Sequence, residues 1–305
     1  MAILLLLVLG GAAAGAFGAL LGLGGGVLIV PLLTLGFGLD FRDAVAISLL
    51  AVVTTSSASA AVYLERRVAD LRLGMRLELA TAVGGVVGAL VAFALEERML
   101  AAIFALMLTL TALSMVRRAI SDRRAQSATA NATATPTTTV MSTAAATDTA
   151  TVMDTATATA AGAAGPVTPN VEAGEGYVVR RLPLGLALSG LAGVASALLG
   201  IGGGIVKVPA MHLVMGVPLR IATATSNLMM GVTASASAVL YLLRGSVDPY
   251  VAGPVVAGVF IGATAASRVA PRVPLGAIRL LFILVLAYVA LEMAARAAGG
   301  SLFGV

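Results

Sequence analysis

Two short glycine-rich segments contain the residues whose types and spacing are most suited to chemistry. The first reads Gly22-Leu-Gly-Gly-Gly26 and the second Gly200-Ile-Gly-Gly-Gly204. Successive glycines disfavour a helix, by about 1 kcal/mol each relative to alanine, and an unwound segment leaves backbone amides free to bind an anion. The candidate anion-binding amides are those of Gly24, Gly25, Gly26, Gly202, Gly203 and Gly204. The alternative is that these glycines allow helices to pack closely.

Two ionisable side chains lie inside apolar runs, and we expect them to be the only ones there. Lys207 is the single lysine of the chain and follows Gly204 by three residues. An ammonium in such a run needs a partner or a wet cavity, so we expect Lys207 to attract an anion unless it snorkels to an interface. His212, the single histidine, is suited to relay protons or to pack as a neutral residue between helices.

Polar residues of small size recur next to these segments. Ser48, Ser226 and Asn227 lie in predicted helices, where their side chains either line a polar path or bond to the preceding carbonyls. We include all three among the candidate substrate-binding residues. The chain has no cysteine and no G-x-S-x-G or H-E-x-x-H motif, so we predict no enzyme, no catalytic residue, no metal site and no cofactor.

The composition indicates the surroundings in which these residues must work. Of the 305 residues, 59% are apolar and only 11% are charged, with a mean hydropathy of +1.04. Soluble domains have about 25% charged residues, so the chain is predicted to be a multi-pass protein of the plasma membrane. Its arginines lie between apolar runs, which the positive-inside rule explains without nucleic acid. Charge-free runs of about 20 residues favour helices over a β-barrel.

An internal repeat organises the chain. When the sequence is shifted by 178 residues, positions 15–70 align with 193–248 without a gap, at 26 identities in 56 positions. The two glycine segments then coincide, Ser48 aligns with Ser226, and Lys207 aligns with Ile29. A repeat of this length is typical of a duplicated half of a secondary transporter.

The repeat divides the chain into three parts. We expect a first transmembrane repeat at 1–118, a cytoplasmic low-complexity linker rich in alanine and threonine at 119–181, and a second repeat at 182–297. The fold class is an all-α membrane protein with about 8–10 membrane segments, of which 27–38 and 205–219 are short or broken. Inverted repeats place 14 of the 18 arginines inside, against 12 for parallel repeats, and are therefore favoured.

The paired GLGGGVLIVP and GIGGGIVKVP segments, and the G-x-x-x-R-x-A-x-A-x-S stretches that follow them, resemble the TauE/SafE family. This family is also called the sulfite exporter or toluene-sulfonate uptake permease family. The resemblance covers both halves and omits only the linker. It implies a polytopic permease for sulfur-containing or organic anions such as sulfite and sulfonates.

These observations together predict a secondary transporter of small anions, with the substrate held between the two glycine-rich elements. The expected partners are the anion, the lipid bilayer and a coupling ion, either H⁺ or Na⁺, and a homo-oligomer stays open. Two other classes also stay open: an anion channel, and a structural or assembly membrane protein that transports nothing.

Overall fold

The structure is a computed structural model that describes residues 2–21, 24–65, 69–133, 179, 181–269 and 275–297. The first half of the chain contains α1 (Ala2–Leu21), the short α2 (Gly26–Pro31) with a π-helical turn (Leu32–Gly36), α3 (Phe41–Glu65), α4 (Leu71–Ala94) and α5 (Glu97–Thr133). The second half contains α6 (Leu182–Leu199), the short α7 (Gly204–Pro209) with a π-helical turn (Ala210–Val214), α8 (Leu219–Leu243), α9 (Pro249–Val269) and α10 (Leu275–Ala297). The described residues are helical or lie in turns, which confirms the all-α fold class.

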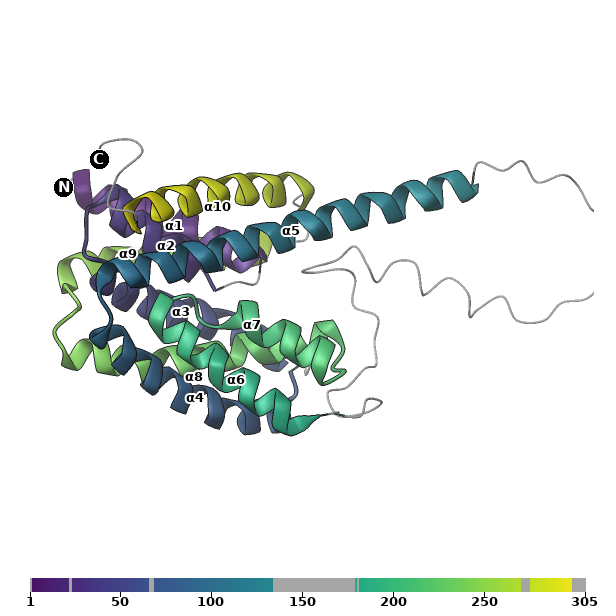
Figure 1. Ribbon diagram of the computed structural model, residues 1–305. Coiled ribbons are helices and arrows are strands. Elements are labelled where there is room, and N and C mark those ends of the chain that lie inside the picture. Colours follow the sequence, from purple (N-terminus) through teal and green to yellow (C-terminus); the bar gives the residue numbers. More distant parts are fainter. Residues whose placement is uncertain are drawn as a thin grey trace, which may run out of the picture.

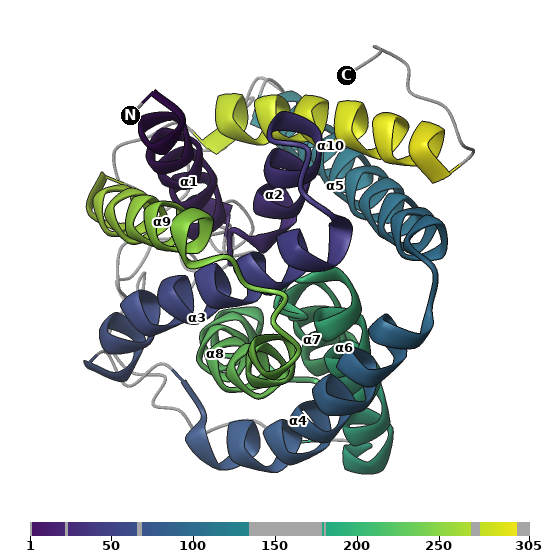
Figure 2. The ribbon, with the colours of Figure 1, turned by 90° about the vertical axis from the view of Figure 1, so that its left-hand side faces the viewer.

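The two halves have the same order of elements. Each half packs against the other through the same pairs of helices. The first helix of each half lies against the fourth helix of the other half, so that α1 packs on α9 and α4 packs on α6. The third helices, α3 and α8, cross each other between these two pairs, and the fifth helices, α5 and α10, also pair (Figure 2). The repeat seen in the sequence is therefore a structural repeat.

The two halves are inverted relative to each other. The close contacts are Gly11–Val255 and Gly15–Val259 between α1 and α9, and Gly84–Gly190 and Gly88–Val194 between α4 and α6. Residue numbers rise together in both pairs, so each pair of helices is parallel. Within one half the first and fourth helices run in opposite directions (Figure 1). A first helix that is parallel to the other half's fourth helix therefore requires inversion, as the arginine distribution predicted.

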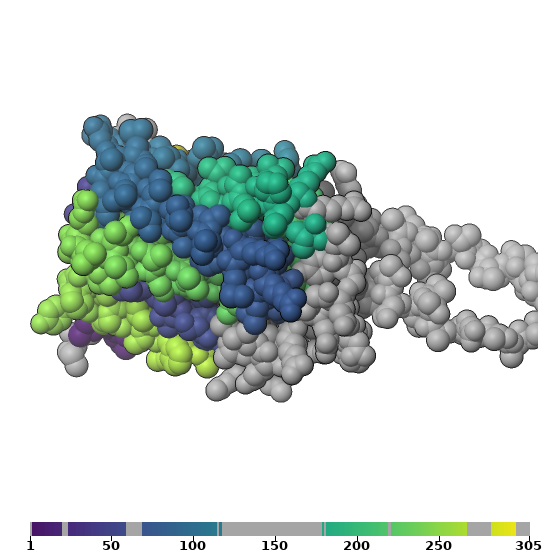
Figure 3. Space-filling model, turned by 90° about the horizontal axis from the view of Figure 1, so that it is seen from below, coloured from purple at the N-terminus to yellow at the C-terminus, as the bar shows by residue number. Residues whose placement is uncertain are grey.

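The surface of the helix bundle is apolar around its middle. Leu79 and Val83 of α4 are 76% and 63% exposed, and Leu191 of the neighbouring α6 is 63% exposed. Figure 3 shows the face of the molecule on which α4 and α6 lie. Among the described residues, seven helices are long and apolar enough to cross a membrane, namely α1, α3, α4, α5, α6, α8 and α9. Large apolar side chains facing outward from such helices are suited to contact lipid.

Helix α5 extends into the segment that is predicted to be the linker. The helix α5 continues to Thr133, whereas the linker was expected to begin at 119. The last part of α5 reads RRAQSATANAT. Alanine is the best helix former, so the alanines of this segment allow the helix to continue into the predicted linker. Residues 134–178 lie outside the described residues, and the cytoplasmic location of the linker stays a prediction.

Candidate functional site

The two glycine segments interrupt the helices as expected. Gly24 and Gly25 have φ angles of 76° and 72°, and Gly202 and Gly203 have φ angles of 75° and 70°. This left-handed region is open to glycine at little cost and disfavours other residues. Each turn ends a long helix and starts a short one, so α2 begins at Gly26 and α7 begins at Gly204. Gly22 and Leu23 lie outside the described residues.

Both short helices begin near the middle of the bundle and run toward opposite ends (Figure 1). Each has 11 residues including its π-helical turn, which corresponds to about 16 Å at 1.5 Å per residue. Such a helix covers about half of a hydrocarbon core that is about 30 Å thick. The first amides of a helix have no acceptor within it and carry the positive end of its dipole. Two positive helix ends therefore meet in the centre of the protein.

The two glycine turns touch each other. A methyl group on Gly26 would overlap the main-chain oxygen of Gly200, which belongs to the other half. The buried Ser48 of α3 lies at the same contact and donates from Oγ to the oxygen of Gly200 at 2.7 Å, with the oxygen of Gly26 at 3.2 Å. The structure thus brings both glycine elements and Ser48 into one place.

Two buried serine hydroxyls beside the second glycine turn have no hydrogen-bond partner. They are Oγ of Ser196 on α6 and Oγ of Ser226 on α8, and both residues are 0% exposed. Ser196 lies against Gly203, and Ser226 lies against Gly204. Buried polar groups are nearly always bonded, so two free hydroxyls at one turn indicate a place where a ligand can complete them. Ser226 is among the residues predicted from the sequence to bind substrate, whereas Ser196, whose repeat counterpart is Gly18, is not.

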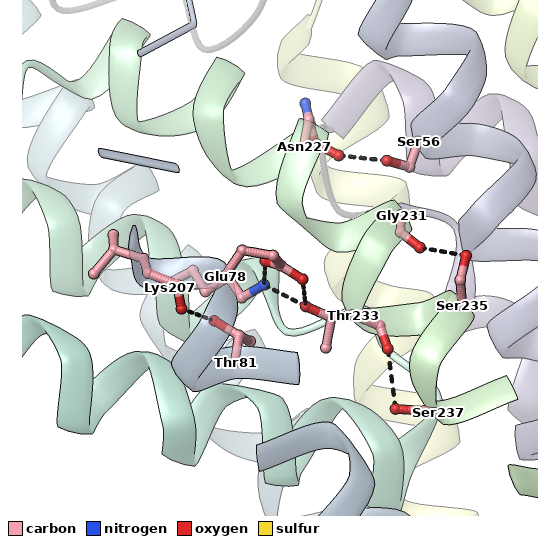
Figure 4. Close-up of polar contacts among 10 residues, drawn as sticks. Ser56, Glu78, Thr81, Lys207, Asn227, Gly231, Thr233, Ser235 and Ser237 are labelled. Atoms are coloured by element: carbon pink, nitrogen blue, oxygen red, sulfur yellow. Dashed lines mark hydrogen bonds and ion pairs between the residues drawn. The ribbon is translucent and has the colours of Figure 1, made fainter. Parts of the chain in front are cut away.

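Lys207 is fully buried and bonded to side chains of two other helices (Figure 4). Its Nζ lies 3.4 Å from Oε2 of Glu78 on α4 and 2.9 Å from Oγ1 of Thr233 on α8. The Thr233 hydroxyl in turn donates to Oε1 of Glu78 at 2.6 Å. The ammonium is therefore held in an ion pair inside the protein, and it does not snorkel to an interface.

The expectation that Lys207 and His212 are the only ionisable residues in the apolar segments is wrong. Glu78 and Glu292 are buried in α4 and α10, at 8% and 5% exposure. Both were read as the ends of apolar runs, because charge-free stretches begin or stop beside them. Helix α4 begins at Leu71, so Glu78 lies two turns inside it. The signal that could have found Glu78 is the single carboxylate within LRLGMRLELATAVGG, opposite in sign to the buried lysine.

The other candidates are placed less centrally. The main-chain oxygen of Asn227 accepts a hydrogen bond from Ser56, which ties α8 to α3 (Figure 4). Nδ1 of His212 lies 2.9 Å from the main-chain oxygen of Val217, and His212 is exposed. His212 is thus bonded to the loop that follows its own helix, and its role in proton relay stays a prediction.

A surface cavity lies at the end of the bundle where α4 and α6 begin. It has a volume of about 360 Å³ and is lined by Asp70, Arg72, Leu73, Arg76, Val179 and Leu182. None of these residues belongs to a glycine turn. The two glycine turns are in direct contact in this structure.

These features define a polytopic helical membrane protein built from two inverted repeats, with two broken helices meeting at its centre. The chain belongs to the sulfite exporter TauE/SafE family, whose model matches residues 7–293. Membership of this family makes the chain a membrane transporter and points to transport rather than catalysis.

A similarity to one curated protein agrees with the family. The chain is 26% identical over 265 residues to the probable membrane transporter protein YunE of Bacillus subtilis (strain 168), which covers 84% of this chain and 85% of that protein. No solved structure matches the chain.

Proposed function

We propose that the protein is a secondary transporter that moves small sulfur-containing or organic anions, such as sulfite or sulfonates, across the plasma membrane. The observation that carries this proposal is the meeting of two helix N-termini, at Gly26 and Gly204, in the centre of an inverted repeat. Helix N-termini bind anions through free amides and the helix dipole, and inverted-repeat transporters bind substrate near the membrane midplane with such half-helices.

The second repeat provides more binding groups than the first. Ser196 and Ser226 offer free hydroxyls at its glycine turn, and Lys207 lies three residues beyond Gly204. In a helix the Cα–Cβ bond tilts toward the N-terminus, so the Lys207 side chain starts back toward that turn. An anion bound here would accept hydrogen bonds from amides, hydroxyls and one ammonium.

Transport then requires the contact between the two glycine turns to open and close. Gly26 has no room for a methyl group beside Gly200, so the turns must separate before an anion can enter between them. The halves contact each other through α1 with α9 and α4 with α6, where glycines allow close packing, and also through α3 with α8 and α5 with α10. Rocking of one half against the other along these interfaces would expose the site to each side in turn.

The test begins with binding to the purified protein. Sulfite, thiosulfate, methanesulfonate, acetate and chloride are added separately, and thermal unfolding is followed by helical circular dichroism, because the chain has no tryptophan and no cysteine. A ligand that binds the native state raises the unfolding temperature according to its occupancy. We expect stabilisation by at least one sulfur-containing anion and none by chloride.

Counterflow in proteoliposomes then distinguishes a carrier from a channel. A carrier loaded with unlabelled anion accumulates labelled anion transiently, whereas a channel only equilibrates it. Binding of a sulfur-containing anion with counterflow supports the proposal. Stabilisation by none of the anions, or flux without counterflow, would overturn it.

A further inference from the structure

The buried ion pair between Lys207 and Glu78 is present in only one of the two repeats. The repeat counterparts of Lys207, Glu78 and Thr233 are Ile29, Val256 and Thr55. Thr55 donates to the main-chain oxygen of Gly24, whereas Thr233 donates to a carboxylate. The equivalent positions in the first repeat therefore carry apolar residues, so the fold does not need an ion pair there.

An ion pair at this depth is not explained by stability. Removing two charges from water costs several kcal/mol per ion, and replacement of a buried pair by apolar residues is often neutral or stabilising. The first repeat contains that apolar version, with Ile29 fully buried. Ionisable residues in membrane segments usually mark the pathway of a substrate or an ion, which favours a role in transport for the pair.

The geometry of the pair shows what the carboxylate does. Glu78 approaches the ammonium with Oε2 at 3.4 Å and accepts the Thr233 hydroxyl with Oε1. A carboxylate has the charge and the acceptor oxygens that a small oxyanion would present to the same two groups. Glu78 thus occupies the place of an anion at Lys207.

We propose that Glu78 and the transported anion compete for Lys207, and that Glu78 takes up one proton when the anion displaces it. This inference rests on the proposed function. Before binding, the site holds one ammonium and one carboxylate. After binding, the ammonium faces the anion, and Glu78 is a neutral carboxylic acid whose proton comes from the solution. The net charge of the site, with the anion counted when it is bound, is zero in both states. Each bound anion is therefore accompanied by one proton.

Among the described residues, Glu78 forms an ion pair with Lys207 alone. It faces Lys207 of α7 and Thr233 of α8. Helix α6 carries no charged residue between Leu182 and Leu199, and α8 carries only Arg220, near its start. On α4 itself, Arg76 is exposed. A buried carboxylate left alone in apolar surroundings is neutralised by protonation in preference to remaining charged.

The experiment measures anion binding as a function of pH in sodium-free buffer. Methanesulfonate and sulfite are the probes, and isothermal titration is performed with the wild type, with Glu78→Gln and with Glu97→Gln, which alters an exposed carboxylate at the start of α5. Uptake of one proton per anion requires the wild-type affinity to fall about tenfold for each unit by which the pH rises. Because methanesulfonate stays ionised, its slope reports protons bound by the protein.

Glu78→Gln should bind the anion more tightly than the wild type and should lose the pH dependence, since the competitor and the proton acceptor are both removed. Glu97→Gln should retain the wild-type slope. If Glu78→Gln does not fold, a second measurement replaces the comparison of its pH dependence with that of the wild type. In weakly buffered solution, we would measure how many protons the wild type and Glu78→Asp take up per bound anion. We expect one proton for each of these two proteins.

The outcomes separate the two proposals. If the wild type binds an anion with an affinity that does not depend on pH, or if Glu78→Gln keeps the slope, the competition is refuted while the transporter proposal stands. If the wild type binds neither these probes nor the other anions of the panel, the proposed function itself fails, and the inference fails with it.

Discussion

Replacement of Lys207 by methionine should strongly destabilise the protein. Methionine has a similar length but no charge, so Glu78 would remain buried in α4 and would keep its hydrogen bond from the Thr233 hydroxyl without its cationic partner. Breaking a buried ion pair by removing one partner costs about 3–5 kcal/mol, because the remaining carboxylate must either stay charged without a partner or take up a proton that it does not hold in the unfolded chain. At about 1.4 kcal/mol per factor of ten, the ratio of folded to unfolded protein should fall by roughly two to three and a half orders of magnitude.

Removal of both partners should reverse this loss. In the double variant Lys207→Met with Glu78→Leu no charge is left without a partner, and the position resembles its counterpart in the first repeat, where Ile29 is fully buried. The double variant should therefore be at least as stable as the wild type. Ile29→Met is the matched control for the new methionine, and a volume-conserving swap of this kind should cost less than about 1.5 kcal/mol.

The assay is unfolding in detergent, followed by helical circular dichroism across the double-mutant cycle. Contacting groups give interaction energies of about 0.5–3 kcal/mol in such cycles, and we expect a value at or above the upper end. A Lys207→Met variant as stable as Ile29→Met, with additive effects in the double variant, would refute the ion-pair reasoning. Anion binding measured on the folded double variant then reports the role of the ammonium without the instability.

Three further predictions follow from the glycine turns and the topology. Gly26→Ala should prevent folding, because the added methyl group overlaps the main chain of the other half. The added methyl group of Gly204→Ala meets mainly the flexible side chain of Met230. This second variant should therefore fold but lose anion affinity. Their expression and binding are compared directly. Ser48→Ala should cost about 0.5–1.5 kcal/mol of unfolding free energy, the usual value for one hydrogen bond. Reporters fused at Thr138 and at the C-terminus should lie on opposite sides of the membrane, and reporters on the same side would contradict the inverted arrangement.

The features predicted correctly from the sequence are those that repeat or that depend on local chain chemistry. The glycine runs predict helix breaks because glycine lacks the Cβ that excludes positive φ, and both turns have the expected left-handed residues. The shift of 178 residues predicts two equivalent halves, and the arginine distribution predicts their inversion because it depends on topology alone. Each of these signals can be read without knowing which helices touch.

The partners of the candidate residues could not be predicted in the same way. Lys207 and Glu78 are separated by 129 positions and meet only because α4 packs against the second half. The extent of α5 is hard to predict for a different reason, since the composition near its end resembles that of the linker. Amino-acid composition predicts poorly where a helix ends unless a cap or a proline marks the boundary.

The duplication allows each residue of one repeat to be compared with the residue at the aligned position of the other repeat. Residues that the fold requires should be similar in both repeats, as Gly84 and Gly262 are, since both allow close packing against the first helix of the other half. The differing positions Lys207, Glu78 and Ser196 align with Ile29, Val256 and Gly18. The polar member of each pair lies on α4, α6 or α7, which pack together around the second glycine turn. Because the first repeat has none of these polar groups, packing alone does not require them, and the proposed anion is expected to bind nearer to Gly204 than to Gly26.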